Sequence, residues 1–340
     1  MNAGIVPLAR IHEARPLVER SVARTPLLGS ATAASIVRAT SGVRIADDRL
    51  YVKSEHLQKT GSFKARGMSW RVATLTDDQR ATGLITLSAG NAGQAYAWAA
   101  SALGARATVV MPAGAVRSKV EACVGYGAEV VLHGDHVGET FAEMERLRDE
   151  RGLTFCHPFD DPEVIAGHGS LGLDLLDDLP DVDVVVVGIG GGGLISGVAA
   201  AIRETRPGVR VYGVEPEGSN ALSQAWDRGE VVRIQPQSVA DGLNAPFAGA
   251  WTLAMTRRYL EDIVLLDDAT ILGGMRFAAE RMKQVLEPAG AAALAAVLFG
   301  SVRLRDADRV AVVASGGNVE TGRFGELLEG AAPIPGQRKA

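Results

Sequence analysis

The chain has 340 residues, of which 47% are hydrophobic and 22% are charged, and these are the proportions of an ordinary folded globular protein. Its formal net charge of −5 is spread over both signs, with no basic run and no patch of basic residues interleaved with aromatic ones. This pattern argues against nucleic acid and against an anionic membrane surface as partners, and we expect a small-molecule ligand.

The N-terminal stretch lacks the apolar core of a signal peptide, and no apolar run reaches the roughly 18 residues of a membrane span, so we expect a cytoplasmic protein without a membrane anchor. The only cysteines, Cys123 and Cys156, share no metal-binding spacing and are expected to be reduced, partly buried thiols. The longest apolar run, residues 291–300, is typical of a buried helix.

From Gly83 onward, short β-rich runs alternate with helical patterns. The runs LITL, ATVVM and AEVVL are expected strands, each followed by a helix. The alternation resumes after Pro158 with a helix near residues 165–179, then the strand that begins at Val184, then VRVYGVE, and finally RVAVVA before Ser315. This rhythm predicts an α/β protein with two doubly wound, mostly parallel sheets. We expect a small domain at residues 83–155, a large domain formed by residues 1–82 and 156–330, and a tail at residues 331–340.

The stretch VVVVGIGGGGLISG, residues 184–197, joins a predicted buried strand to a predicted helix. Glycines leave their backbone N–H groups open, and together with the positive end of a helix these groups bind an anion without any charged side chain. A turn that binds nothing is less favoured, because four consecutive glycines cost backbone entropy with no packing in return. Two kinds of phosphate-bearing cofactor fit this pattern.

The first is a dinucleotide. Gly188, Gly190 and Gly193 match the pattern GxGxxG, and Glu215 ends the next strand, where an acid would bind a ribose. Against this, the pattern usually lies in the first βα unit of its domain, whereas several units precede this one. Glu215 also lies farther along the chain than the usual distance of about 20 residues. A nicotinamide oxidoreductase is therefore the less favoured alternative.

Three further segments carry polar groups beside predicted turns and strand ends. Lys64 follows a turn in SEHLQKTGSFKARG, residues 54–67, and begins a helical pattern. The loop SAGNAG, residues 88–93, offers hydroxyl, amide and N–H groups at a helix N-terminus. SGGN, residues 315–318, ends the strand VAVVA, where open α/β sheets bind ligands. Each segment alone would be a surface lysine, a helix cap or a turn, so the function depends on their combination with the glycines.

Taken together, the segments resemble the fold-type II, tryptophan synthase β-like family of pyridoxal 5′-phosphate enzymes, and within it the serine and threonine dehydratases and serine racemases. The resemblance covers most of the chain, from about residue 20 to about residue 330. The matching segments are GSFKARG, SAGN, GGGG, VADGL at residues 239–243, a segment expected as one helix, MRFAAERMKQVLEPAGAAALAA at residues 275–296, and SGGNV. The resemblance implies an enzyme with pyridoxal phosphate as its cofactor, and homodimers as the family's usual assembly.

The resemblance also implies roles for single residues. Lys64 would form the Schiff base with the cofactor and then act as base on Cα, which requires an amine that loses its proton more easily than a free lysine, as burial beside Phe63 would allow. Ser315 would face the pyridine nitrogen, and Asn318 and Glu287 would support that end of the site. The cofactor phosphate would be held by Gly190, Gly191, Gly192, Gly193 and Leu194, the ring hydroxyl by Asn91, and the substrate carboxylate by Ser88, Ala89, Gly90, Asn91 and Ala92.

A neutral serine at the pyridine nitrogen does not force that nitrogen to stay protonated, so prompt loss of a β-leaving group is favoured over a long-lived carbanion. The expected reaction is α,β-elimination of L-threonine or L-serine to an enamine and then to the 2-oxo acid and ammonia. The alternatives are a bulkier β-hydroxy amino acid, such as a hydroxyaspartate, a phenylserine or a hydroxyectoine-derived substrate, β-replacement by an added nucleophile, and a catalytically silent binding protein.

Some positions depart from the family pattern. Ala89 stands where serine racemases have a second serine, and a methyl group moves no proton, so little racemisation is expected. Ala92 stands where the family often has histidine, which leaves the substrate side chain undetermined. Some members bind a divalent cation near Glu215, but Ala221 and Leu222 occupy the region of the second carboxylate, so we predict no metal site.

Overall fold

The computed structural model describes residues 4–336, and its larger sheet has six strands in the order β1-β2-β10-β7-β8-β9. Neighbouring strands run parallel except for the pair β1 and β2 at one edge. The strands are β1 (Leu27–Ser30), β2 (Leu50–Lys53), β7 (Val184–Gly188), β8 (Arg210–Pro216), β9 (Asp262–Leu266) and β10 (Val310–Val313).

The second sheet has four parallel strands in the order β5-β4-β3-β6. They are β3 (Leu84–Leu87), β4 (Ala107–Met111), β5 (Glu129–Leu132) and β6 (Thr154–Phe155). Two sheets with predominantly parallel strands and helices on both faces confirm the predicted fold class.

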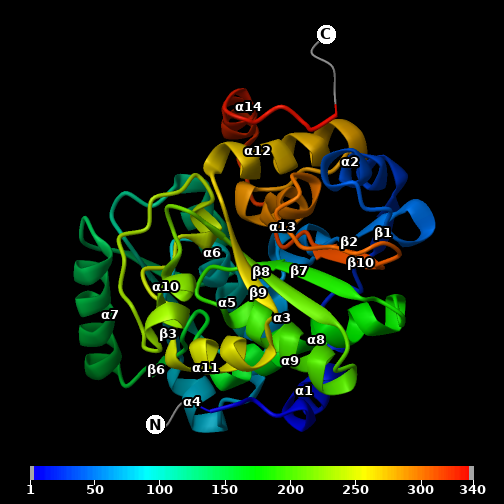
Figure 1. Cartoon of the computed structure of the whole chain (residues 1–340). Coiled ribbons are helices and arrows are strands. Elements are labelled where there is room, and N and C mark those ends of the chain that lie inside the picture. The colour runs from blue at the N-terminus through cyan, green and yellow to red at the C-terminus, as the bar shows by residue number, and fades with distance from the viewer. Residues whose placement is uncertain (1–3, 337–340) are drawn as a thin grey trace.

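Helices cover both faces of the larger sheet (Figure 1), with α2, α12 and α13 on one side and α1, α8, α9 and α11 on the other. The smaller sheet is accompanied by α5, α6 and α7. The helices are α1 (Leu8–Ser21), α2 (Ala31–Ser41), α3 (Lys64–Ala73), α4 (Asp77–Thr82), α5 (Asn91–Ala102), α6 (Arg117–Gly125), α7 (Val137–Arg151), α8 (Pro162–Asp178), α9 (Gly193–Thr205), α10 (Ala221–Arg228), α11 (Ala250–Tyr259), α12 (Asp268–Phe277), α13 (Pro288–Leu298) and α14 (Thr321–Glu329).

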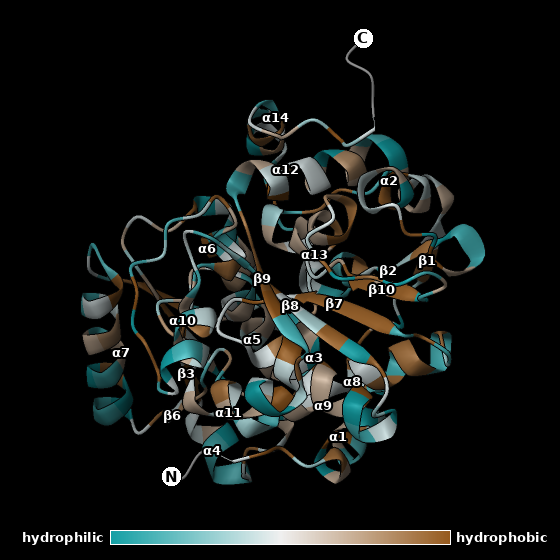
Figure 2. Ribbon diagram, viewed as in Figure 1, coloured by the Kyte–Doolittle hydropathy of each residue, from teal (hydrophilic) through white to brown (hydrophobic). Residues whose placement is uncertain are grey.

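Most of the core lies on the two faces of the larger sheet, and smaller apolar clusters pack against the second sheet. Strand β7 is buried along its whole length, as its run of valines predicts, and its apolar colour stands out in Figure 2. Helix α13 is apolar on all sides and every one of its residues is buried, which confirms the predicted buried helix in this region. Both cysteines are free thiols in buried positions. Among residues 4–336, no helix has the length and apolar character needed to cross a bilayer.

The expectation of one helix over residues 275–296 is wrong. Helix α12 ends at Phe277, a π-helical turn covers Ala278–Met282, and Lys283 has a left-handed backbone with φ of 59°. Pro288 is the first residue of α13, because proline lacks the N–H that a helix interior requires and fits the first turn. Glu287, the residue that precedes α13, is buried.

The strand order brings the important segments together. Strands β2, β10 and β7 are neighbours and run parallel, so their carboxyl ends lie at one edge of the sheet. The chain continues from β2 to Lys64, from β10 to Ser315 and from β7 to the glycines. In an open α/β sheet this edge is the usual place for a ligand.

Candidate active site

Lys64 is the first residue of α3, as its place after the TGS turn predicts. Its Nζ donates a hydrogen bond to the carbonyl oxygen of Pro158 at 2.8 Å and lies 5.1 Å from the centre of the Phe63 ring. Burial lowers the pKa of the Lys64 amine from 10.5 to about 8. About a tenth of this amine is therefore neutral at pH 7, far more than for an ordinary lysine.

The glycine segment forms the turn between β7 and α9. Gly192 precedes the helix with a φ of 89°, a conformation that favours glycine. A Cβ on Gly191 would lie 2.3 Å from the Phe159 ring, and one on Gly192 would lie 2.7 Å from Cβ of Thr252. Only a bare backbone fits here. The first N–H groups of α9 have no partner within the helix, so the turn presents donors and a positive helix end to an anion.

Asn91, Glu287 and Asn318 form one chain of hydrogen bonds, although they are far apart in the sequence. The Asn91 amide donates to Oε1 of Glu287 at 2.6 Å, and the Asn318 amide donates to Oδ1 of Asn91 at 2.8 Å and to the carbonyl of Thr60 at 2.7 Å. Burial, followed by the negative charge of Asp241, raises the pKa of the Glu287 carboxyl group to about 8. The cluster therefore ends in a carboxyl group that is mostly neutral near neutral pH.

Ser315 follows β10 and is buried. Its Oγ lies 3.5 Å from the carbonyl of Ala289, and its own carbonyl accepts the N–H of Phe63 at 3.0 Å. Ser62 and Gly316 form an isolated antiparallel bridge. The segments that carry Lys64 and Ser315 are therefore hydrogen-bonded side by side.

The loop Ser88–Asn91 lies where β3 ends and α5 begins. Gly90 precedes the helix without a side-chain cap, and its N–H donates to Oγ of Ser88 at 3.2 Å. Ala92 is buried, and Ala89 packs against the core of the smaller sheet. The free N–H groups of this helix end form a second anion-binding position, and Asn91 links it to Glu287.

Sequence reasoning missed the segment that follows β6. The carbonyl of Pro158 accepts the lysine amine, Phe159 covers Gly191, and His157 packs edge-on against Phe159 with ring centres 4.6 Å apart. These contacts are made by a backbone oxygen and by aromatic faces, which carry no motif. The one feature of the sequence that could have indicated His157, Pro158 and Phe159 is their place directly after a strand of the second sheet.

Glu215 lies at the end of β8, and its carboxylate is buried. It accepts hydrogen bonds from the N–H of Leu222 at 2.9 Å and from the N–H and Oγ of Ser223 at 2.8 and 2.6 Å. Burial raises the pKa of this carboxyl group to about 7. Glu215 thus anchors the first turn of α10. No group of three or more His, Cys, Asp or Glu side chains suited to a metal ion occurs within residues 4–336, and the absence of a metal stays a prediction.

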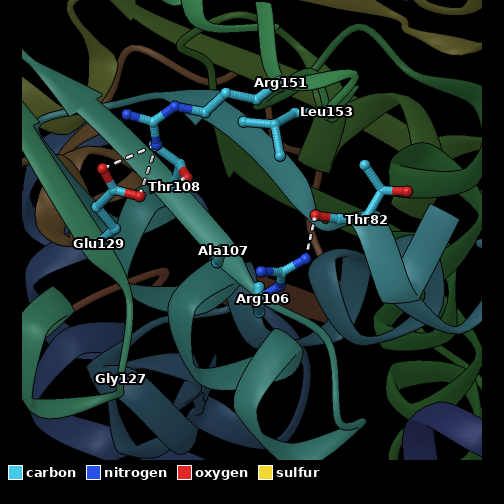
Figure 3. A pocket seen from close by; sticks show the side chains of 8 residues that line it. All are labelled: Thr82, Arg106, Ala107, Thr108, Gly127, Glu129, Arg151 and Leu153. Atoms are coloured by element: carbon cyan, nitrogen blue, oxygen red, sulfur yellow. Dashed lines mark hydrogen bonds and ion pairs between the residues drawn. The ribbon is translucent and has the colours of Figure 1, made fainter.

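Two cavities are distinct from the glycine turn. One of about 310 Å³ lies at the starts of β4 and β6, where Arg151 pairs with Glu129 and Arg106 donates to the carbonyl of Thr82 (Figure 3). Its arginines are already partnered, and none of the predicted site residues lines it. The other, of about 450 Å³, reaches Asn318 and so opens beside the Asn91 cluster.

Residues 18–316 match the profile of a family described as pyridoxal-phosphate dependent enzyme. The chain belongs to this family. The L-threonine ammonia-lyase of Thermotoga maritima is 38% identical over 325 residues, which cover 95% of this chain and 78% of the relative. A maize serine racemase structure has a TM-score of 0.88 at 32% identity, covering 95% and 97% of the two chains. The processed form of threonine deaminase isoform 2 from Solanum lycopersicum has a TM-score of 0.86 at 29% identity, covering 95% and 87%.

The residues present fit the cofactor of a pyridoxal-phosphate-dependent enzyme. A lysine of lowered pKa follows β2, a glycine turn that excludes side chains follows β7, and a buried serine hydroxyl follows β10, the strand between them. When bound, pyridoxal phosphate supplies an electron sink for breaking a bond at the substrate Cα. Within the described residues, the groups available to such a cofactor are the first N–H groups of α9 and α5, the buried amine of Lys64 and the hydroxyl of Ser315.

Proposed function

We propose that this enzyme catalyses α,β-elimination of a β-hydroxy amino acid, with L-threonine and L-serine as substrates and a 2-oxo acid and ammonia as products. The observation that carries the proposal is the buried amine of Lys64, whose pKa burial lowers to about 8 and which bonds to Pro158, the neighbour of the Phe159 ring that covers the glycine turn. The similarity to the Thermotoga maritima L-threonine ammonia-lyase over most of both chains supports this choice of substrate.

The site residues have the following proposed roles. Lys64 carries the cofactor and takes the proton from Cα, because burial leaves its amine partly neutral at working pH. Ser315 would supply a neutral hydroxyl group to the pyridine nitrogen. The remaining contacts are assigned to Phe63, Gly190, Gly191, Gly192, Gly193, Leu194, Asn91 and Glu287 for the cofactor and to Ser88, Ala89, Gly90, Asn91 and Ala92 for the substrate carboxylate and its surroundings.

Elimination is favoured over racemisation, even though one structurally similar protein is a serine racemase. Racemisation needs a second group that delivers a proton to the face of Cα opposite the lysine. The residue after Ser88 is Ala89, whose methyl group delivers none. Rapid formation of D-serine from L-serine by the pure enzyme would contradict this assignment.

A bulkier β-hydroxy amino acid is the second candidate substrate. The observation that favours it is Ala92, a small buried residue in the first turn of α5 beside the proposed carboxylate position. Comparison of kcat/KM for threonine, hydroxyaspartate and phenylserine separates the two candidates. Product analysis with and without an added thiol distinguishes elimination from β-replacement.

The central experiment uses the purified protein supplied with pyridoxal phosphate. The wild type is expected to show the visible absorption of a lysine-bound cofactor and to release 2-oxobutanoate and ammonia from L-threonine. Lys64→Ala should abolish both the absorption and turnover. Lys59→Ala is the matched control, because Lys59 is an exposed lysine on the same loop and should behave as wild type. Retained turnover in Lys64→Ala would refute the assigned mechanism.

We also propose a cytoplasmic homodimer in which residues 83–155 form the small domain, residues 1–82 and 156–330 the large one, and 331–340 a tail. The four strands of the smaller sheet lie between residues 84 and 155, which supports this division. Light scattering on the eluting protein tests the assembly, and limited proteolysis near residues 83 and 155 tests the division.

A further inference from the structure

Helix α8 lies between the two helices whose first turns form the candidate site. It packs against α3, which begins at Lys64, and against α9, which follows the glycine turn. The helix backbones approach closely at glycines. A Cβ on Gly167 would lie 2.8 Å from the Cα of Gly67 in α3, and a Cβ on Gly197 in α9 would lie 2.3 Å from the carbonyl oxygen of Ile165. Helix α8 therefore sets the spacing between the lysine and the glycine turn.

His168 is a side chain of α8 that reaches the backbone of the first turn of α3, whereas Ser170 and Asp174 reach the Arg66 side chain. It is completely buried, and its Nδ1 accepts the N–H of Gly67 at 3.1 Å. Its ring contacts the Phe63 ring edge-on, with centres 4.8 Å apart. The same Phe63 ring lies beside the Lys64 amine. His168 thus contacts both the residue before the lysine and the backbone three residues after it.

The hydrogen bond from Gly67 replaces one that the helix itself would make. In a regular α-helix the N–H of Gly67 would donate to the carbonyl of Phe63. Here that carbonyl accepts the N–H of Arg66 at 3.0 Å, and the N–H of Gly67 donates to the imidazole of His168. An imidazole from a neighbouring helix therefore caps the start of α3, where the preceding residue offers no side-chain cap.

The surroundings keep this imidazole neutral. Burial, followed by the positive charges of Lys64 and Arg66, lowers the pKa of His168 well below its ordinary value. Arg66 is itself paired with Glu55 and Asp174. A neutral ring that accepts at Nδ1 carries its proton on Nε2, and that atom has no hydrogen-bond partner within the described residues. Within the described residues, the bond from Gly67 is therefore the hydrogen bond that this ring makes.

We propose that His168 is a positioning residue that, through Gly67 and Phe63, holds the first turn of α3 so that the Lys64 amine stays buried against the Pro158 carbonyl. The inference rests on the proposed role of Lys64 as the cofactor-binding lysine. Without the acceptor, the first turn of α3 is free to shift, the amine reaches water, and its pKa returns toward the ordinary lysine value. A misplacement of about 1 Å is enough to lower turnover about 100-fold.

The test uses the full-length protein in two forms. In the cofactor-free form, Lys64 is labelled with an amine-reactive anhydride over a range of pH and quantified by peptide mass spectrometry, with the exposed Lys59 as internal reference. In the holoenzyme, kcat and KM are measured with L-threonine. The variants are His168→Leu, which has no acceptor, and His168→Gln, whose amide oxygen can accept the N–H of Gly67.

Gly172→Ala provides the matched structural control. It lies one turn farther along α8, and its Cβ would press on the backbone of α9, 2.8 Å from the carbonyl of Val198. It should lower the melting temperature without changing the labelling of Lys64. If His168→Leu does not fold, His168→Ala takes its place, since it removes the acceptor without adding bulk.

In the wild type, in Gly172→Ala and in His168→Gln, the pH at which labelling of Lys64 is half-maximal is expected near 8. In His168→Leu this midpoint should move toward 10.5. The kcat of His168→Leu should also fall far more than its KM changes. A folded His168→Leu or His168→Ala with a wild-type midpoint and kcat would overturn the proposal, as would a Gln variant that shifts the midpoint. If the midpoint moves as expected but no 2-oxo acid forms in the wild type, the proposed function fails while the positioning role stands.

Discussion

Gly191→Ala tests the glycine turn most directly. The added Cβ would lie 2.3 Å from the ring of Phe159, and an ordinary contact begins at 3.4 Å. The ring and the turn must therefore separate by about 1 Å, a displacement that lowers turnover roughly 100-fold when it disturbs a site. Overpacking of this kind also costs about 1 to 3 kcal/mol of stability. We expect weaker binding of pyridoxal phosphate and a lower kcat with threonine.

The assay combines titration with pyridoxal phosphate, thermal unfolding and threonine turnover. Gly208→Ala is the matched control, because no atom lies within 4 Å of its added Cβ and it should behave as wild type. Phe159→Ala in the Gly191→Ala background removes the colliding ring and should recover part of the affinity. A Gly191→Ala protein that binds the cofactor as tightly as the wild type would refute the assignment of this turn to the phosphate.

Two further substitutions test the buried charges. Burial raises the pKa of Glu287 to about 8, so the contribution of this carboxyl group to stability is fully present below pH 4.5 and is lost as the pH rises through 8. In Glu287→Gln, the melting temperature should therefore depend less on pH in this range. An unchanged slope would contradict the assignment. Arg66→Met removes the only ion-pair partner that the buried Glu55 has among the described residues, and should cost about 3 to 5 kcal/mol in urea unfolding. Arg146→Met, which breaks two helix ion pairs of a half-exposed arginine, should change little, and equal effects would count against a buried network.

Local patterns in the sequence predicted most strands and helices correctly. Strand β7 is a run of valines and α13 a run of small apolar residues, and each pattern is recognisable without any tertiary contact. The strands β1, β2, β6 and β9 were not predicted: β1, β6 and β9 are only partly buried, and β2 is a run of four residues that ends in a lysine. The end of α12 at Phe277 was not predicted either, because the family resemblance treated residues 275–296, which include Pro288, as one helix.

The sequence by itself determined which chemical groups this protein has: the lysine after its turn, the four glycines, the amide of Asn91 and the hydroxyl of Ser315. Only the tertiary structure decided how they act on one another. Asn91 and Glu287 are 196 positions apart and lie 2.6 Å from each other, and the acceptor of the Lys64 amine is a backbone oxygen with no motif. A pKa depends on burial and on neighbouring charges, and both come from segments that meet only when the sheets are formed.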